Sequence, residues 1–466
     1  MPSVITIRFD QGTLVLEGVD DAVAQALGDL VVADERIRAH RASAHDYAAL
    51  LRALHGRYEY RDEAKAYGEL LLNERAPMAM RPYQRAALEA WEMAKRRGVV
   101  VLPTGAGKTY VALRAILSAA RSALILVPTI DLVQQWATDL EQRLDQPIGR
   151  YGGGDRDLQD ITVATYDSGI LIMPSKGNRF GLLVCDECHH LPAPATAAAA
   201  MACIAPFRLG LTATPERTDG GHHALDGLLG SIVHRVDITE LEGNYLANYQ
   251  AEVLEVPLDE DEAQIYQENR ERYLSFVRGR GLDFSRPDGW QRFIAEAARA
   301  PDGRDVLRAY REQKRISRAS RAKLRMVWEL LRDHAGERCI IFTDDNATAY
   351  AIGRAMVLPV LTHHTKGAER KKLLDAFRSG ELPVMATSRV LNEGVDVPEA
   401  TLGIVVSGTG SVREHVQRLG RILRPRDGKV AVLYELVSAG TGEAYTSQRR
   451  REHTAFGELE IDLEQA

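Results

Sequence analysis

A glycine-rich run near the start of the chain has the residue types of a phosphate-binding loop. Residues Leu102–Thr109 have the sequence LPTGAGKT, which follows an apolar run and precedes a helix-forming segment that begins at Tyr110. This strand–loop–helix context is the one that such a loop requires. The glycines would let backbone amides close around a triphosphate, Lys108 would meet the β and γ oxygens, and the Thr109 hydroxyl would bind Mg²⁺. The run departs from the strict G-x-x-x-x-G-K-[ST] pattern only at Leu102, where that pattern has glycine.

Two adjacent carboxylates follow a later apolar run. Asp186 and Glu187 come directly after the predicted buried strand 182–185. Ligands bind at the carboxyl edge of parallel sheets, so both side chains are expected to emerge where a ligand would lie. Asp186 would hold Mg²⁺ through its water shell, and Glu187 would orient and deprotonate the water that attacks the γ-phosphate. Together with the glycine-rich loop, the pair predicts nucleoside triphosphate hydrolysis.

The same segment also fits a metal-binding C-x-x-C pattern. Cys185 and Cys188 flank the carboxylates, and His189 and His190 follow, so a zinc site is an alternative. However, successive side chains of a strand point to opposite faces, and the sequence has no second cysteine pair to complete four ligands. We therefore favour the magnesium hypothesis over the zinc one.

The elements that must position these residues alternate between short apolar runs and longer amphipathic stretches. This pattern is typical of buried parallel strands with crossover helices. Four such runs lie in an earlier part of the chain and four in a later part: 99–102, 123–127, 161–164 and 182–185, then 339–342, 384–387, 402–406 and 430–434. The chain is therefore expected to contain two α/β domains in tandem.

Two further segments have a different pattern. Residues 1–75 begin with two strand-like runs separated by an Asp-Gln-Gly turn and continue with a helical stretch, which predicts a small α+β domain. Residues 259–325 are polar and helical, and the acidic run at 259–262 suits a helix N-terminus. We expect an accessory domain at 1–75, a first α/β domain at 76–240, and a second at 241–466 that contains the helical insertion.

Composition restricts the class of protein. At 466 residues the chain exceeds what one core supports, and about 150 residues per domain suggests about three domains. A net charge of -6 gives no sign of a polyanionic partner, so any nucleic-acid surface must be a local patch. The four cysteines lie in apolar surroundings, and no signal peptide or apolar run of about 20 residues occurs. These features predict a cytoplasmic protein with buried thiols and no membrane segment.

The motifs together resemble those of superfamily 2 helicases. The glycine-rich loop, the Asp-Glu-Cys-His segment 186–189 and the Leu-Thr-Ala-Thr-Pro segment 211–215 match early motifs, and residues 390–398 and 417–425 resemble the fifth and sixth. Within that superfamily the chain resembles the XPB branch, with archaeal and bacterial members nearest. The residues that carry this closer resemblance are Arg-Pro-Tyr-Gln at 81–84, Val-Pro-Thr at 127–129 with Gln135-Trp136, Asp-Glu-Cys-His-His-Leu-Pro at 186–192 and Leu-Gly-Arg-Ile-Leu-Arg-Pro at 419–425.

The resemblance implies a fold and a set of residue roles. The fold would be α/β, with two tandem RecA-like parallel-sheet domains, a helical thumb insertion and a small N-terminal α+β domain. The nucleotide would be ATP, with Arg81 and Gln84 near the adenine. The phosphates would be surrounded by Thr104, Gly105, Ala106, Gly107, Lys108 and Thr109.

The resemblance also assigns residues of the second domain. Gln417, Arg421 and Arg424 would come from that domain, where an arginine stabilises the charge that builds on the γ-phosphoryl oxygens. Gly394 and Asp396 would sense both DNA and ribose. In the first domain, Thr212 and Thr214 would couple the nucleotide site to the nucleic-acid track.

DNA is the partner that the resemblance implies. Family members carry an Arg-Glu-Asp loop thought to help part the strands, and here Arg217-Thr218-Asp219 occupies that position with threonine in the middle. The helical insertion resembles the family's thumb, and residues 1–75 take the place of its damage-recognition domain. The implied activity is ATP-dependent movement 3′ to 5′ along single-stranded or forked DNA, in nucleotide excision repair. A nuclease partner, as archaeal relatives have, is also implied.

Five arginines repeat at helical spacing in the insertion. Arg304, Arg308, Arg311, Arg315 and Arg318 would share one helix face. Both phosphate binding and a solvated face that is partly paired by Glu312 are compatible with this spacing.

Three other functions compete with a DNA motor. A restriction-type nuclease motor would need a carboxylate–lysine nuclease core, which residues 1–75 do not show. A scaffold without hydrolysis would be expected to lack Lys108, Glu187 or Arg421, and all three are present. An RNA-remodelling superfamily 2 helicase is the nearer alternative, and ATPase stimulation by DNA or by RNA separates the two.

Overall fold

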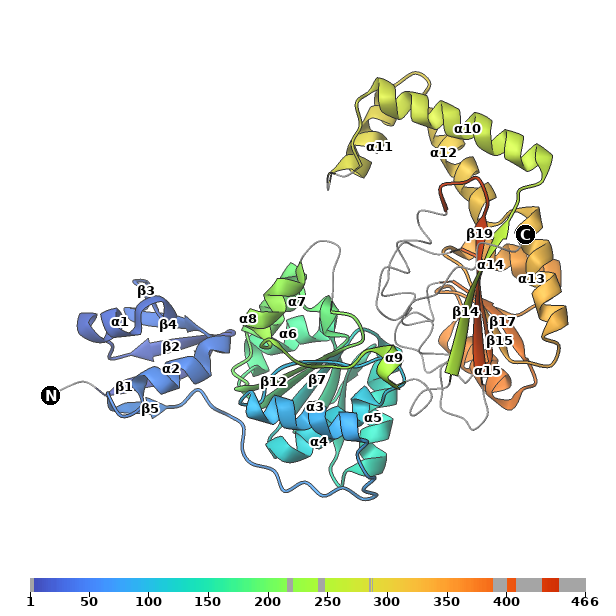
Figure 1. Ribbon diagram of the computed structural model, residues 1–466. Helices are drawn as coiled ribbons and strands as arrows, with labels where there is room; N and C mark the ends of the chain where they lie inside the picture. Colours follow the sequence, from blue (N-terminus) through green and yellow to red (C-terminus); the bar gives the residue numbers. More distant parts are fainter. Residues whose placement is uncertain are drawn as a thin grey trace. The chain divides into compact units, whose positions relative to one another are not determined.

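The computed structural model describes residues 4–215, 221–241, 248–284, 286, 288–388, 400–407 and 430–443. Among these residues, the chain up to Glu240 forms one compact unit and the chain from Leu241 forms another. Figure 1 shows the elements of each unit. Among the described helices, none is both long and apolar enough to cross a membrane.

The chain begins with a small α+β domain. Its five-stranded sheet has the order β3-β4-β2-β1-β5, in which β1 pairs antiparallel with β2 and parallel with β5. Its core includes Ile7, Leu14 and Leu50. The elements are β1 (Ile5–Asp10), β2 (Thr13–Glu17), α1 (Asp21–Leu27), η1 (Gly28–Leu30), β3 (Val32–Asp34), β4 (Ala39–Ser43), η2 (Ala44–Asp46), α2 (Tyr47–Leu54) and β5 (Tyr60–Asp62).

An eight-stranded sheet forms the rest of the first unit. Its order is β13-β6-β12-β11-β7-β10-β8-β9, and every neighbouring pair is parallel except β8 with β9. The strands are β6 (Arg97–Val101), β7 (Ala123–Val127), β8 (Ile148–Gly152), β9 (Asp155–Arg156), β10 (Ile161–Thr165), β11 (Leu182–Asp186), β12 (Phe207–Thr212) and β13 (Ile232–Arg235). Every residue of β7, β10 and β11 is buried, as expected for central strands covered on both faces.

The helical elements of this α/β domain are α3 (Pro82–Met93), α4 (Lys108–Ala119), α5 (Ile130–Arg143), α6 (Tyr166–Lys176), η3 (Cys188–His190), α7 (Pro194–Met201), η4 (Gly221–His223), α8 (Ala224–Leu228) and α9 (Ile238–Leu241).

Capping side chains fix the start of two crossover helices. Thr129 accepts a hydrogen bond from the Leu132 amide at α5, and Thr165 does the same for Ser168 at α6.

The second unit contains a six-stranded sheet of order β14-β19-β18-β15-β17-β16, in which all neighbouring pairs are parallel. Its elements are β14 (Asn248–Val256), α13 (Arg321–Asp333), β15 (Cys339–Phe342), α14 (Asn346–Met356), β16 (Val360–Leu361), α15 (Gly367–Ser379), β17 (Val384–Thr387), β18 (Leu402–Val405) and β19 (Val430–Ser438). The helices α10 (Glu260–Gly279), α11 (Gly289–Arg299) and α12 (Gly303–Arg318) follow β14 and extend from one end of this sheet (Figure 1). They have a core of their own, centred on Phe293 and Val306.

Two parallel-sheet α/β domains, a helical insertion and a small N-terminal α+β domain confirm the fold class expected from the sequence. Each run of the sequence pattern that was predicted to be a strand forms one, with ends that differ by a few residues. The carboxyl edge of the eight-stranded sheet brings the loop after β6 close to the carboxylates at the end of β11.

Candidate functional site

The glycine-rich loop connects β6 to α4 and contains two left-handed residues. Gly105 has a φ of 84° and Gly107 a φ of 81°, a region that side chains with a Cβ rarely adopt. A Cβ added to Gly107 would lie 2.5 Å from Nε2 of Gln84. Because α4 begins at Lys108, the amides of Lys108 and Thr109 have no partner within the helix, whereas the Tyr110 amide donates to the Gly107 carbonyl at 3.0 Å. Such a helix start is a binding site for anionic oxygen atoms.

The loop is held in place by the first turn of α3. Nε2 of Gln84 donates a hydrogen bond of 2.9 Å to the carbonyl of Ala106, and the Tyr83 hydroxyl donates one of 2.8 Å to the same oxygen. Oε1 of Gln84 accepts from the Arg81 amide at 3.0 Å. Tyr83 was not predicted as a site residue, although its place in the Arg-Pro-Tyr-Gln segment beside Gln84 was a signal that could have found it.

Asp186 is the last residue of β11 and is 7% exposed. Its Oδ2 accepts a hydrogen bond of 2.9 Å from Nε1 of Trp136, and its Oδ1 accepts one of 3.0 Å from the Glu187 amide. Burial, followed by the charge of Glu187, raises the pKa of Asp186 to about 6, although Lys108 opposes this rise. A buried carboxylate with a raised pKa fits a site that a cation completes, because a bound cation favours the ionised form.

Glu187 points toward the loop from an unusual backbone conformation. Its φ of 48° and ψ of 51° place it in the left-handed region, which is uncommon for a residue with a side chain and often marks a functional site. Oε1 of Glu187 lies 3.8 Å from Nζ of Lys108, and both side chains are mostly buried. Nζ of Lys108 also donates a hydrogen bond of 3.3 Å to the carbonyl of Leu102. The structure thus brings together the lysine and the acid that the sequence predicted.

Two buried oxygen atoms in this region lack a hydrogen-bond partner within the described part of the chain. They are Oγ1 of Thr104, in the loop, and Oε2 of Glu187. Buried polar atoms are nearly always satisfied in folded proteins, so such atoms at a helix start indicate that a polar ligand completes the site. Together with the buried Asp186 carboxylate, they fit a phosphate chain with a hard cation, which prefers oxygen ligands.

His189 connects Glu187 to Thr212, the last residue of the neighbouring strand β12. His189 is fully buried, and its Nδ1 lies 3.5 Å from Oε2 of Glu187 and 3.1 Å from Oγ1 of Thr212. The Thr214 amide donates a hydrogen bond of 3.2 Å to Oγ1 of Thr212. The contacts therefore run from the predicted catalytic acid to the Thr-Ala-Thr segment that leaves the sheet.

The cysteines near the site are apolar core residues. Cys185, Cys188 and Cys203 are fully buried. Burial raises the pKa of Cys185 to about 12 and also raises the pKa of the other two thiols. All three thiols belong to the apolar core of the first α/β domain. In the described ranges, no group of three or more His, Cys, Asp or Glu side chains is arranged to hold a metal ion.

Several predicted site residues lie outside the described residues, so their roles remain predictions. They are Arg217, Asp219, Gly394, Asp396, Gln417, Arg421 and Arg424. Thr109, the second residue of α4, is described and is adjacent to Lys108.

Three family models match separate parts of the chain. Residues 7–64 match the Xeroderma pigmentosum group B helicase damage recognition domain, and residues 306–455 match the ERCC3/RAD25/XPB C-terminal helicase. Residues 77–217 match the res subunit of type III restriction enzymes. The restriction-enzyme match thus covers most of the first α/β domain, whereas both models on either side of it are specific to XPB.

Known proteins resemble most of the chain. It is 43% identical to the DNA 3'-5' translocase XPB2 of Sulfurisphaera tokodaii, over 80% of this chain and 84% of that protein. It is 31% identical to the DNA 3'-5' helicase XPB of Mycobacterium tuberculosis, over 80% of this chain and 63% of the relative. The crystal structure of the Pyrococcus furiosus Hef helicase domain superposes with a TM-score of 0.54 at 21% identity, over 79% of this chain and 98% of that one. This last likeness supports the fold alone.

Proposed function

The chain belongs to the XPB family of superfamily 2 helicases, and we propose that it is an ATP-driven motor that moves 3′ to 5′ along DNA. The observation that carries the proposal is the 3.8 Å approach of Lys108 to Glu187 beside the glycine-rich loop. This geometry puts a cation for the phosphates and a base for the attacking water at the same edge of one sheet.

In the proposed mechanism, Nζ of Lys108 and the amides of residues 104–109, except that of Ala106, which donates to the Pro103 carbonyl, bind the phosphates of ATP. Asp186 and Thr109 would hold Mg²⁺, which when bound neutralises charge on the phosphate oxygens. Glu187 accepts a proton from the water that attacks the γ-phosphate. We assign Tyr83 and Gln84 the task of fixing the loop through Ala106, and Arg81 and Gln84 a place near the adenine.

The second domain would complete the site. Gln417, Arg421 and Arg424 are proposed to reach the γ-phosphate from that domain, with Arg421 stabilising the transition state as an arginine finger. Gly394 and Asp396 are proposed to respond to DNA and to the ribose. Hydrolysis would then require the two domains to close, which makes movement along DNA dependent on ATP.

DNA contact is proposed to reach the catalytic acid through the first domain. Thr212 is the last residue of β12, and Thr214 follows it in the chain before Arg217-Thr218-Asp219. His189 contacts both Thr212 and Glu187. A shift of the Thr-Ala-Thr segment on DNA would therefore displace His189 and reorient the base. This contact supports the coupling role that the sequence assigned to the two threonines.

The biological setting is part of the same proposal. The DNA would be single-stranded or forked, the pathway nucleotide excision repair, and the damage-recognition-like domain at 1–75 would contribute lesion contact. A nuclease is the proposed partner. Buried, free thiols suit a reducing compartment, so the proposed location is the cytoplasm.

The decisive experiment measures direction and nucleic-acid class together. Streptavidin bound to either end of a single-stranded oligonucleotide is displaced only by a motor that moves toward that end. We expect ATP-dependent displacement from the 5′ end, no displacement by Glu187→Gln, and stronger ATPase stimulation by DNA than by RNA. Displacement from the 3′ end alone would contradict the direction, and stronger stimulation by RNA would favour the RNA-remodelling alternative.

Strand separation is a separate question, because threonine occupies the middle of the Arg-x-Asp loop. Forked DNA unwound equally by the wild type and by Thr218→Glu would mean that Thr218 does not limit separation. Faster unwinding by Thr218→Glu would mean that Thr218 limits strand separation, so that the wild type moves along DNA more readily than it unwinds it.

A further inference from the structure

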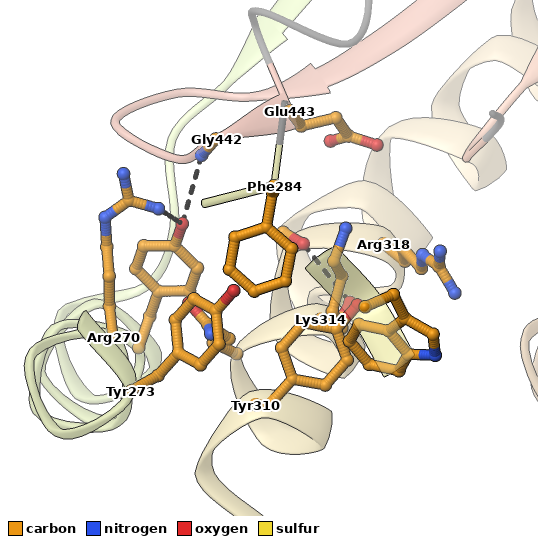
Figure 2. A pocket seen from close by; sticks show the side chains of 12 residues that line it. Arg270, Tyr273, Phe284, Tyr310, Lys314, Arg318, Gly442 and Glu443 are labelled. Carbon is orange, nitrogen blue, oxygen red and sulfur yellow. Dashed lines mark hydrogen bonds between the residues drawn. The ribbon is translucent and has the colours of Figure 1, made fainter. Parts of the chain in front are cut away.

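A pocket of about 290 Å³ lies in the second unit between α10, α12 and the turn after β19. Its volume is near the lower end for small-molecule sites. Five aromatic rings line it, from Tyr266, Tyr273, Phe284, Trp290 and Tyr310. Figure 2 shows the rings of Tyr273, Phe284 and Tyr310 grouped together, with Arg270 on one side and Lys314 and Arg318 on the other. No residue of the ATP site described above contributes to it.

The rings offer surfaces on which a flat ligand can stack. Tyr310 lies 5.2 Å from Tyr273 and 5.1 Å from Trp290, measured between ring centroids. Phe284 and Trp290 remain 42% and 45% exposed, although apolar burial would favour covering them. Exposed aromatic faces beside cations are the usual platform for the bases of single-stranded nucleic acid.

Two of the three cations at the pocket form no ion pair among the residues that the structure describes. Arg318 is paired with Asp344 at 2.5 Å. Lys314 and Arg270 form no ion pair within the described part of the chain, and Arg270 instead donates a hydrogen bond of 3.0 Å to the Tyr266 hydroxyl. The charges of Asp344 and Glu443 act on Lys314, so Arg270 is the cation at the pocket that is most open to an anionic group such as a phosphate.

Two polar side chains of the pocket wall are candidates for ligand contact. Gln313 lines the pocket and is 6% exposed. Oε1 of Glu443 is buried without a partner, whereas Oε2 of the same carboxylate accepts 2.6 Å and 3.0 Å hydrogen bonds from Lys323 and the Ser438 amide. Lys323 thereby balances the charge of Glu443, while the free Oε1 and the Gln313 amide remain available to the ligand.

We infer that this pocket binds one nucleotide unit, with its base among the aromatic rings and its phosphate at Arg270 and Lys314. A base supplies the flat face on which the rings can stack. The edge of a base carries hydrogen-bond donors and acceptors, which can pair with the Gln313 amide and with Oε1 of Glu443. A simple anion would make no contact with Gln313 or the rings. An apolar ligand would supply no anionic group for the cations. The unit could be an unpaired nucleotide of DNA, a source that rests on the proposed function, or a free mononucleotide.

The experiment compares a short oligodeoxyadenylate with an abasic oligonucleotide of the same length, using the full chain without ATP. We expect Phe284→Ala to weaken oligodeoxyadenylate binding by about 5-fold or more, because stacking contributes on that scale. Gln313→Leu should weaken it by about 5-fold, because the edge of the base loses a hydrogen-bonding partner. The affinity of both variants for the abasic strand should stay within about 2-fold of the wild-type affinity, because the phosphates of that strand still have their contacts. Arg304→Gln, which removes an exposed arginine of α12 outside the pocket, is the matched control. It should change the affinity for the two strands by the same factor.

A second arm distinguishes the two sources of the nucleotide. Deoxyadenosine monophosphate is titrated into the Lys108→Ala variant, whose ATP site is disabled, and the emission of Trp290 is followed against a Trp290→Phe background. Saturable quenching that Phe284→Ala removes, combined with unchanged oligonucleotide binding, would support a free nucleotide as the ligand. A loss confined to the oligonucleotide would support a DNA strand.

The inference is overturned if both pocket variants, folded by their thermal transitions, bind oligodeoxyadenylate and deoxyadenosine monophosphate as the wild type does. A separate result tests the proposed function. If wild-type ATPase is not stimulated by DNA, the motor proposal fails, while the mononucleotide titration still decides whether the pocket takes a nucleotide.

Discussion

Nε1 of Trp136, on α5, donates a 2.9 Å hydrogen bond to Oδ2 of Asp186 at the end of β11. The two residues are 50 positions apart in the sequence, and Trp136 is 2% exposed. The indole therefore fixes the orientation of a buried carboxylate that is proposed to hold Mg²⁺. A second helix thus participates in the site, in addition to the loop and the strand that the motifs identify.

Replacing Trp136 by phenylalanine should shift the pH dependence of ATP hydrolysis. The hydrogen bond from Trp136 lowers the pKa of Asp186, so its loss should raise that pKa further and leave less of the ionised form near neutrality. We expect the acidic limb of kcat/KM to move to higher pH in Trp136→Phe. Trp91→Phe is the matched control, because Trp91 is also buried but donates to the carbonyl of Arg208. An equal shift in both variants would contradict the assignment.

The raised pKa of Asp186 predicts how stability depends on pH without metal. The folded-state pKa is about 6 and the ordinary value is 3.8, so between these pH values the folded chain holds a proton that the unfolded chain has lost. The protonated Asp186 therefore contributes to the stability of the folded chain fully below pH 3.8, and this contribution is lost as pH rises through about 6. Asparagine keeps only one of the two acceptor oxygens but does not titrate. Relative to wild type, the Tm of Asp186→Asn should therefore be higher near pH 8 than in acid, by about 2 °C or more.

The same Asp186→Asn protein should lose most of its ATPase activity, because a neutral amide is a poorer ligand for a hard cation. Thermal scans in a chelating buffer, paired with ATPase assays in Mg²⁺, check both outcomes. A Tm difference from wild type that does not grow between acid and pH 8 would contradict the prediction.

Alanine at position 107 should damage ATP binding. The new Cβ would lie 2.5 Å from Nε2 of Gln84, and the φ of 81° would cost about 1–3 kcal/mol for a residue with a side chain. We expect about a 5-fold or greater loss of affinity for a fluorescent ATP analogue. Gly227→Ala is the control, because nothing lies within 4 Å of a Cβ added there. Wild-type affinity in Gly107→Ala would show that the loop adapts.

Glutamine at position 187 should separate binding from hydrolysis. Its amide keeps the size of the side chain but cannot accept the proton of the attacking water, so kcat should fall by about 100-fold or more. ATP binding should be retained, because Lys108 and the loop amides are unchanged. Equilibrium binding and single-turnover assays measure the two quantities. An equal loss of both would mean that Glu187 contributes to binding and is not the base.

Valine at position 212 should weaken the coupling of DNA to hydrolysis. It has nearly the shape of threonine but lacks the oxygen that contacts His189 at 3.1 Å and accepts from the Thr214 amide. We expect the ratio of DNA-stimulated to basal ATPase to fall by about 5-fold or more, on the usual scale of coupling between sites. An unchanged ratio would exclude Thr212 from the coupling route.

Much of the fold could be predicted because buried parallel strands leave a local signal. Strands covered on both faces need continuous apolar runs, and 123–127, 339–342 and 384–387 form strands with the predicted ends. β12 was not among the predicted strands because Arg208 interrupts its apolar run. In the structure Arg208 is fully buried, and its guanidinium donates to the backbone carbonyls of Ala200, Cys203, Ala205 and Leu228. That compensation comes from other segments and leaves no local pattern.

The sequence by itself determined which residues can bind phosphate and activate water, because a glycine loop before a helix and carboxylates after a strand are local arrangements. Only the tertiary structure decided how these groups are held: Gln84 against Ala106, Trp136 against Asp186, and His189 between Glu187 and Thr212. It also decided that α10 and α12 enclose an aromatic, cationic pocket. Such contacts join elements far apart in the chain, and the pKa of Asp186 depends on a burial that exists only once these elements have packed.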